Sequence, residues 1–148
     1  MRFSSFLIVL FGVTFLSLLI VLIFILGKCG KENFTDMDPM IIELHAIASK
    51  VHPKAANNIT LKQGPKSYTV NKKDVTLCLK DPDGEYYNKN MLTYVLLHEI
   101  SHTLCKSVGH TQEFYDINDK LLQRASDLGY YSFSIPIVKD YIKNCGMG

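Results

Sequence analysis

The residues best suited to do chemistry in this chain are His98, Glu99 and His102, which form an H-E-x-x-H motif. Residues four apart lie on one face of a helix, so the two histidines can present their imidazoles to one metal ion. Glu99 directly follows the first histidine, and its carboxylate can reach a water on that ion without being a ligand. This spacing is typical of a helical zinc site that carries its own general base.

The chemistry expected of such a motif is hydrolysis of a peptide bond. A Zn²⁺ ion lowers the pKa of a bound water from about 15.7 toward 7 and polarises the scissile carbonyl. Glu99 would then take the proton as general base and pass it to the leaving amine. The motif therefore predicts a zinc metallopeptidase, a hydrolase, whose substrate is a protein or peptide.

The residues that flank the motif are apolar, which favours a buried active-site helix over a chance pattern on an exposed one. These flanking residues are Val95, Leu96, Leu97, Ile100 and Leu104.

A catalytic zinc normally has three protein ligands and one open position, so a third ligand is needed. His110 is favoured, because it follows Gly109, where the chain must turn after the motif helix. Glu113, Asp116 and Cys105 are alternatives. Cys105 is better explained as a buried apolar thiol, and Glu113 as an acidic residue in the first turn of the next helix.

Two other hypotheses remain open at the level of sequence. The first is a binding or structural protein tethered to a membrane, whose zinc site is closed by four protein ligands with Cys105 as the fourth. The second is a chance motif that binds no metal. One relative is excluded by spacing, because the metzincin pattern needs Gly and His where this chain has Cys105 and Val108.

The motif L-H-E-I-S-H, followed by G-H-T-Q-E-F and a leucine-rich helix, resembles the WLM and SprT-like zinc metallopeptidases. The resemblance is greatest to short versions carried by large DNA viruses. It implies that His98, His102 and His110 are the zinc ligands, that Glu99 is the catalytic base and that Phe114 has a structural role. The interval from His102 to His110 is two residues longer than the commonest WLM spacing.

The resemblance covers roughly residues 75–129 and is specific in the motif helix. Familiar members of this family cut proteins that are crosslinked to DNA. That role is not carried over, because the chain has no basic stripe and no aromatic platform for nucleic acid. The formal net charge of +2 is also close to balance. No nucleic-acid partner is therefore expected.

The elements that must position the motif can be predicted from helix-capping residues, prolines and the spacing of apolar residues. Asp38 and Pro39 begin a helix that ends before Pro53, and His45 on its apolar stripe is expected to be a hydrogen-bonded core histidine. Strands are expected over 59–61, 67–70 and 74–79, the last two joined by residues 71–73.

The strand over residues 75–79 is expected to line the cleft and pair with an extended substrate. The motif helix should run from Asn88 or Asn90 to about Ser107, and Thr111 should cap a helix that ends at Gly129. The order helix, small sheet, helix, helix predicts an α+β, zincin-like domain in which a short β-sheet packs on the HExxH helix.

Residues 3–27 contain no charged side chain. At about 1.5 Å per residue, a helix of this length exceeds the roughly 30 Å hydrocarbon core of a bilayer. It is also too long for a signal peptide, whose apolar region is about 7–15 residues. The segment predicts a transmembrane helix, hence a single-pass protein of a viral or host membrane. The predicted organisation is an anchor with its flank over 1–30, a linker over 31–37 and a metallopeptidase-like domain over 38–148.

The four cysteines permit disulfides without requiring them, and none forms a CxxC pair. A cysteine-based zinc knuckle is therefore disfavoured.

Overall fold

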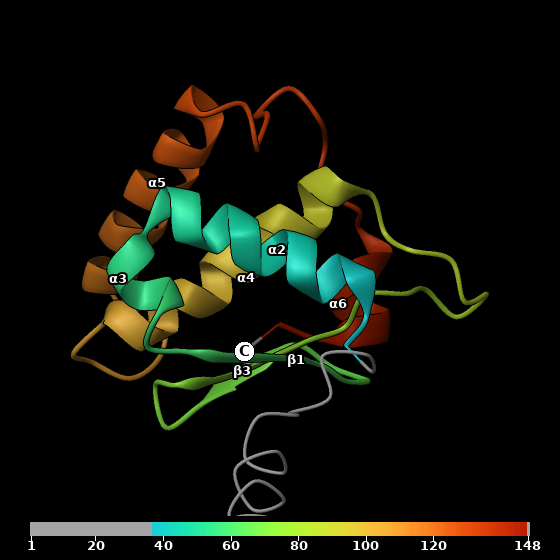
Figure 1. The fold of residues 1–148 in the computed structure, drawn as a ribbon, viewed down its shortest axis with the longest axis horizontal. Helices are drawn as coiled ribbons and strands as arrows, with labels where there is room; N and C mark the ends of the chain where they lie inside the picture. The colour runs from blue at the N-terminus through green and yellow to red at the C-terminus, as the bar shows by residue number, and fades with distance from the viewer. Residues whose placement is uncertain (1–36, 148) are drawn as a thin grey trace, which may run out of the picture. The chain divides into compact units, whose positions relative to one another are not determined.

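The helix that carries the H-E-x-x-H motif, α4 (Lys89–Leu104), lies at the centre of the fold. It packs against the sheet and against α2 (Pro39–Val51), α3 (Pro53–Ala56) and α5 (Gln112–Asp127). Most of its apolar residues are buried, and Tyr94 and Leu104 are partly buried, as expected for a helix that the core largely surrounds. In Figure 1, α2 and α4 lie together over one face of the sheet. The buried apolar residues of α4 are Met91, Leu92, Val95, Leu96, Leu97 and Ile100.

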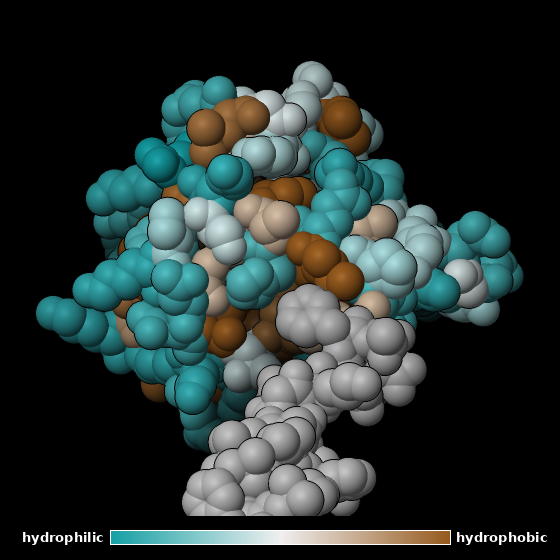
Figure 2. Space-filling view, in the orientation of Figure 1, coloured by the Kyte–Doolittle hydropathy of each residue, from teal (hydrophilic) through white to brown (hydrophobic). Residues whose placement is uncertain are grey.

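The computed structural model describes residues 37–147, in which five helices and three strands form a small α+β fold. No helix in this part of the chain is long and apolar enough to cross a bilayer. The longest, α4 and α5, have 16 residues each, or about 24 Å at the usual helical rise. Figure 2 shows one face of the molecule, which is largely hydrophilic with apolar residues in small, separate groups.

These findings correct two predictions made from the sequence. The transmembrane helix predicted over residues 3–27 lies outside the described residues, and the expectation rested only on the length of that segment and its lack of charge. The fold class that the structure supports is a small α+β domain, without the transmembrane helix that was included in the prediction. Single-pass membrane localisation is likewise not supported.

The sheet has the strand order β1-β3-β2. β1 (Thr60–Gln63) pairs parallel with β3 (Asp74–Leu77), and β2 (Tyr68–Val70) pairs antiparallel with it. The chain therefore skips from one edge to the other and returns to the middle. The strand that was expected to pair with substrate is the central one, β3, which already has a neighbour on each side. That expectation is wrong, and β2 is the edge strand on the side of the motif helix.

The register of the sheet decides which side chains face α4. Thr69 of β2 lies opposite Val75 of β3, which lies opposite Leu61 of β1. Residues at one level of a sheet point to the same face, and Leu61 and Val75 are buried in the core. Thr69 therefore points to the helical layer as well.

The turn between β2 and β3 confirms the connection predicted at residues 71–73. Asn71 and Lys72 have φ angles of 53° and 55°, the left-handed pair of angles that a two-residue hairpin turn requires. The hairpin is closed by the Lys73 N–H, which donates to the Val70 carbonyl at 3.0 Å. We call Asn71 and Lys72 the hairpin tip.

The first described helix has the ends that its sequence predicts. The Asp38 carboxylate accepts the Met40 N–H at 2.8 Å, and α2 ends at Val51, before Pro53. The ring of His45 is hydrogen-bonded, as expected, because its Nε2 lies 3.2 Å from the Ala56 carbonyl oxygen. This histidine supports the join between α2 and α3.

The last helix, α6 (Asp140–Cys145), is fastened to the other end of the hairpin, at Ser67 and Cys78, which we call the hairpin base. A disulfide joins Cys78 to Cys145. The buried Tyr141 hydroxyl donates to the Cys78 carbonyl at 2.7 Å and lies 2.7 Å from the Ser67 hydroxyl. Burial raises the pKa of Tyr141 to about 12. The Ser67 N–H donates to the Cys145 carbonyl at 3.0 Å, so α6 is held by both covalent and polar links.

Candidate metal centre

Three histidine side chains converge at one end of α4. The ring nitrogens of His98, His102 and His110 that could serve as ligands all lie within 4.8 Å of one another. The Nε2 atoms of His98 and His110 are 3.0 Å apart. In a tetrahedral site with metal–nitrogen distances near 2.0–2.1 Å, ligand nitrogens are about 3.3 Å apart. The cluster could therefore hold one metal ion, and it contains the three histidines predicted from the sequence.

The cluster is buried on one side and open on the other. His98 is only 5% exposed, His102 is partly buried and His110 is exposed. The helix thus supplies the two more buried histidines, and the loop after it supplies the exposed one. An ion held here would be reachable from solvent on the side of His110.

The loop that carries His110 is held in place by the hairpin tip. The helix α4 ends at Leu104, three residues before the predicted end at Ser107, because the following backbone groups find other partners. The Lys72 ammonium group donates to the carbonyls of Cys105, of Lys106 at 2.7 Å and of Ser107 at 3.3 Å. Carbonyls at a helix end otherwise lack partners.

The turn that brings His110 back toward the motif occurs at Gly109, as predicted. Gly109 has a φ of 82°, in the left-handed region that favours glycine. A side chain at this position would strain the backbone there.

Glu113 fastens the same loop from the side of α5. Its carboxylate accepts the N–H groups of Lys106 and Ser107, both at 3.2 Å, and the Ser107 hydroxyl at 2.7 Å. These hydrogen bonds hold the pKa of Glu113 below its usual value, with the largest contribution from the Ser107 hydroxyl and smaller ones from the two backbone N–H groups. The carboxylate is therefore a partner of the loop backbone.

The alternative third ligands lie outside the cluster of metal-ligating atoms found in residues 37–147. Glu113 binds the loop. Asp116 is exposed and accepts the Gln112 side-chain amide at 2.8 Å. Cys105 is a free, buried thiol whose pKa is raised chiefly by burial, as expected for a core cysteine.

Glu99 is fully buried and is oriented by the edge strand. The Thr69 hydroxyl lies 2.8 Å from the Glu99 Oε2 atom and 3.0 Å from the Glu99 carbonyl oxygen. A hydroxyl has one hydrogen to donate, and an ionised carboxylate is the stronger acceptor of the two. Thr69 therefore fixes the carboxylate of the predicted base relative to the histidines.

Phe114 forms the floor of the histidine cluster. Its ring is 1% exposed, and its centroid lies 4.8 Å from that of His98, 4.4 Å from that of His102 and 4.7 Å from that of His110. Contact with all three imidazoles limits their rotation. These contacts fit the structural role that the resemblance implies for Phe114.

Sequence reasoning missed Thr69 and Lys72. A threonine in a short strand and a lysine in a polar turn are ordinary in those places, and nothing local distinguishes them. Tyr94 was missed as well, although it lies four residues before His98 on the same face of α4, with ring centroids 6.3 Å apart. Burial is the main cause that raises the pKa of Tyr94.

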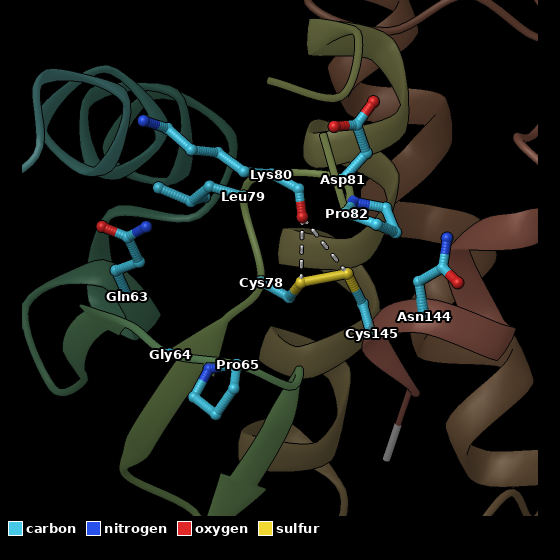
Figure 3. A pocket seen from close by; sticks show the side chains of 10 residues that line it. All are labelled: Gln63, Gly64, Pro65, Cys78, Leu79, Lys80, Asp81, Pro82, Asn144 and Cys145. Carbon is cyan, nitrogen blue, oxygen red and sulfur yellow. Dashed lines mark hydrogen bonds between the residues drawn. A yellow bond between two sulfur atoms is a disulfide. The ribbon is translucent and has the colours of Figure 1, made fainter. Parts of the chain in front are cut away.

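Two cavities of the described domain differ in their chemistry. A cavity of about 440 Å³ adjoins the histidine cluster. It is lined by Tyr68, Thr69, Asn71, Lys72, His102, Ser107, Val108 and Gly109. A larger cavity of about 530 Å³ lies beside the Cys78–Cys145 disulfide, away from the histidines (Figure 3).

The larger cavity has no metal-binding cluster in its lining. In Figure 3 the Lys80 carbonyl points at the disulfide, with its oxygen 3.6 Å from the Cys78 sulfur and 3.9 Å from the Cys145 sulfur. Disulfide sulfurs carry no hydrogen, so these are contacts rather than hydrogen bonds. Size alone would select this cavity, whereas the chemistry of the lining selects the one beside His102.

The proteins that this chain is similar to are viral. It is 51% identical over 86 residues to "Uncharacterized protein 136R" of Invertebrate iridescent virus 6, a match that covers 56% of this chain and 48% of that protein. It is 45% identical over 86 residues to "Uncharacterized protein 042R" of Invertebrate iridescent virus 3, covering 57% and 54%. It is 35% identical over 83 residues to "Uncharacterized protein R325" of Acanthamoeba polyphaga mimivirus, covering 55% and 42%.

The matched region is about half the length of these relatives. No family model matches the chain, and no solved structure matches it. Fold and site together define a small α+β domain with a three-histidine cluster that could hold a metal ion.

Proposed function

We propose that this protein is a zinc-dependent peptidase that resembles the WLM and SprT-like metallopeptidases. His98, His102 and His110 would hold the ion, and Glu99 would act as general base. The observation that carries the proposal is the convergence of His110 on the two motif histidines, since it completes three ligands around one point. A chance H-E-x-x-H pattern would not require a third histidine from a separate loop to arrive there.

The donor set favours zinc in a catalytic rather than a structural site. Three imidazoles suit Zn²⁺, and three protein ligands leave one coordination position for a water or a substrate. A structural zinc site is normally closed by four protein ligands. Cys105, the fourth ligand that the structural alternative would need, is not among the converging atoms.

The residues around the ion have separable roles in the proposed reaction. Bound zinc would supply an activated water and a polarised carbonyl. Glu99 accepts the proton on its carboxylate and returns it to the leaving nitrogen. Thr69 holds that carboxylate through Oε2, and Phe114 holds the imidazole rings. The orientation of the reacting groups is thereby set before substrate arrives, which lowers the cost of reaching the transition state.

A peptide suits the site as substrate because of the strand beside it. β2 pairs with β3 on one side, and no other strand within residues 37–147 pairs with its second side. An extended peptide can add to such an edge through main-chain hydrogen bonds. Thr69 belongs to this strand, so a peptide laid along it would pass close to Glu99.

The first test is the zinc content of the purified full chain, measured beside two histidine variants. His110→Ala removes the third ligand. The control His52→Asn changes a histidine outside the cluster and keeps a side chain able to cap α3. We expect about one zinc per chain in the wild type and the control, and much less in His110→Ala. A folded wild type that takes up no zinc would rule out the proposed function.

The second test separates metal binding from the chemistry. Glu99→Gln should retain zinc but cleave peptides at least about 100-fold more slowly, because the general base is gone. Glu85→Gln, which changes an exposed glutamate in a turn, is the matched control and should cleave like the wild type. Equal cleavage by Glu99→Gln and wild type would disprove the assigned mechanism.

A further inference from the structure

The cavity beside the histidine cluster is continuous with the proposed reaction site. Its lining includes His102, a member of the cluster, and Thr69, whose hydroxyl binds the Glu99 carboxylate. A group that fills this cavity therefore lies next to both the candidate metal site and the proposed base. The cavity of about 530 Å³ beside the disulfide shares no residue with either.

The lining comes from β2, the hairpin tip, α4 and the loop after α4, and the surface that it exposes to the cavity is mostly apolar. β2 contributes its edge at Tyr68 and Thr69, and the loop after α4 contributes Val108, which is 89% exposed. Gly109 adds no side chain. An exposed valine that borders a cavity gains from contact with an apolar ligand, because the contact removes its surface from water.

The charged groups near the cavity already have partners. Lys72 is the only ammonium group in the lining, and its three carbonyl partners belong to the loop that carries His110. The nearby Glu113 carboxylate is bound by Lys106 and Ser107. A charged occupant would lose hydration and find no opposite charge free to compensate it, whereas an uncharged one would not.

We infer that this cavity is the subsite for an uncharged, apolar substrate side chain at one of the two residues that flank the scissile bond. Val108 is its specificity-determining residue. The inference rests on the proposed peptidase function and names the substrate class of the same site. Leucine and phenylalanine side chains are the expected occupants, and aspartate and lysine side chains are disfavoured.

The test uses the zinc-loaded full chain and peptides in which each flanking position is varied among Leu, Phe, Asp and Lys. At one of the two positions, kcat/KM should be at least about tenfold higher for Leu or Phe than for Asp or Lys. Val108→Glu places a carboxylate at the rim of the cavity and should lower the preference for Leu over Lys at least about fivefold. Ile142→Glu, at an exposed residue of α6 outside the lining, should leave that preference unchanged.

A binding measurement provides a readout that does not depend on turnover. Peptides with Leu or Lys at the selected position are titrated into zinc-loaded Glu99→Gln, with and without Val108→Glu, and followed by fluorescence anisotropy. The Leu peptide should bind more tightly, and Val108→Glu should reduce the difference. Val108→Lys is a second variant at the same position, and it should instead reduce the preference for Leu over Asp.

The outcomes separate the two proposals. Cleavage without preference at either flanking position would overturn the subsite and leave the peptidase function standing. A preference that neither Val108→Glu nor Val108→Lys changes would overturn it as well. Failure of the zinc-loaded wild type to cleave any peptide in the set would overturn the proposed function, and the subsite with it.

Discussion

The base and the tip of the β2–β3 hairpin hold the surrounding helices in different ways. At the base, Ser67 and Cys78 bind α6 through a disulfide and the buried Tyr141 hydroxyl. At the tip, Lys72 binds the loop that carries His110 by hydrogen bonds alone. The polar groups of the base bind one another, and the cavity beside it has no histidine in its lining, whereas the tip borders the exposed His110 and the cavity next to the histidine cluster.

Because of this difference, we expect the base to contribute mainly to the stability of the fold and the tip mainly to the binding of a metal ion. A covalent link across a long stretch of chain stabilises the fold whatever else is bound. A loop held only by hydrogen bonds, to Lys72 and to Glu113, can adjust around a bound group without disturbing the core. The comparison predicts that changes at the base lower the free energy of unfolding, and that changes at the tip lower metal affinity.

The largest expected effect is at the base. Replacing Cys78 and Cys145 together with alanine removes a link between residues 67 positions apart, which is worth about 4 kcal/mol of unfolding free energy in the chain-entropy account. Zinc affinity of the folded protein should change less than about threefold, because the cluster has no contact with the disulfide. Chemical denaturation and chelator competition measure the two quantities. A parallel loss of zinc affinity would show that base and tip are coupled.

Phe114→Ala should lower both the stability and the zinc affinity, because this ring belongs to the hydrophobic core and also contacts all three histidines. We expect a loss of about 3 kcal/mol of stability from the cavity that it leaves, together with weaker zinc binding from freer imidazoles. The control Phe133→Ala removes a ring that is 59% exposed, and should cost less than about 0.5 kcal/mol. Zinc affinity equal to that of wild type in Phe114→Ala would contradict the role given to the ring.

Tyr141→Phe tests the polar half of the hairpin base. Loss of the bonds to Ser67 and Cys78 should cost about 1–2 kcal/mol at neutral pH. The pKa of Tyr141 is raised to about 12 in the folded protein against an ordinary value of 10.0, so folding favours the neutral phenol. Its contribution is fully present below pH 10 and is lost as the pH rises toward 12. Urea denaturation between pH 10 and 12 should show that the free energy of unfolding falls more steeply with pH in the wild type than in Tyr141→Phe. Identical slopes would contradict this expectation.

The smallest predicted effect lies at the tip. Lys72→Met should leave the fold intact and weaken zinc binding by about tenfold, since the loop that carries His110 loses its anchor. The neighbouring Lys73→Met removes the same charge at an exposed position and serves as the matched control. Equal loss of affinity in both variants would assign the effect to net charge rather than to the contacts of Lys72.

The parts of the site that are close in sequence could be predicted, and the parts assembled across the sheet could not. The i, i+4 histidines need only one helix, and His110 needs only a turn at Gly109, so spacing was sufficient to bring all three together. The contact of Thr69 with Glu99 depends on the order β1-β3-β2 and on its register. No local pattern specifies a non-sequential strand order, and placing the central strand at the edge was the resulting error.

Contacts between residues far apart in the sequence also explain why the disulfide pairing and the end of α4 could not be predicted. The presence of four cysteines permitted a disulfide, but the choice of Cys78 and Cys145 depends on where α6 docks. The early end of α4 depends on Lys72 and Glu113, which take up the loop backbone from two other elements. The transmembrane prediction, in contrast, used composition alone over residues outside the described domain, and it is not supported.

The shortness of β2 bears on how the protein behaves when concentrated. An unpaired strand edge can recruit the edges of other molecules and seed intermolecular sheets. β2 is only three residues long, and the exposed Lys66 and Lys73 lie near its ends. Two copies joined along this edge would form few hydrogen bonds and bring like charges together. The shortness of β2 and its flanking lysines therefore disfavour self-assembly along the edge at which we propose that a peptide binds.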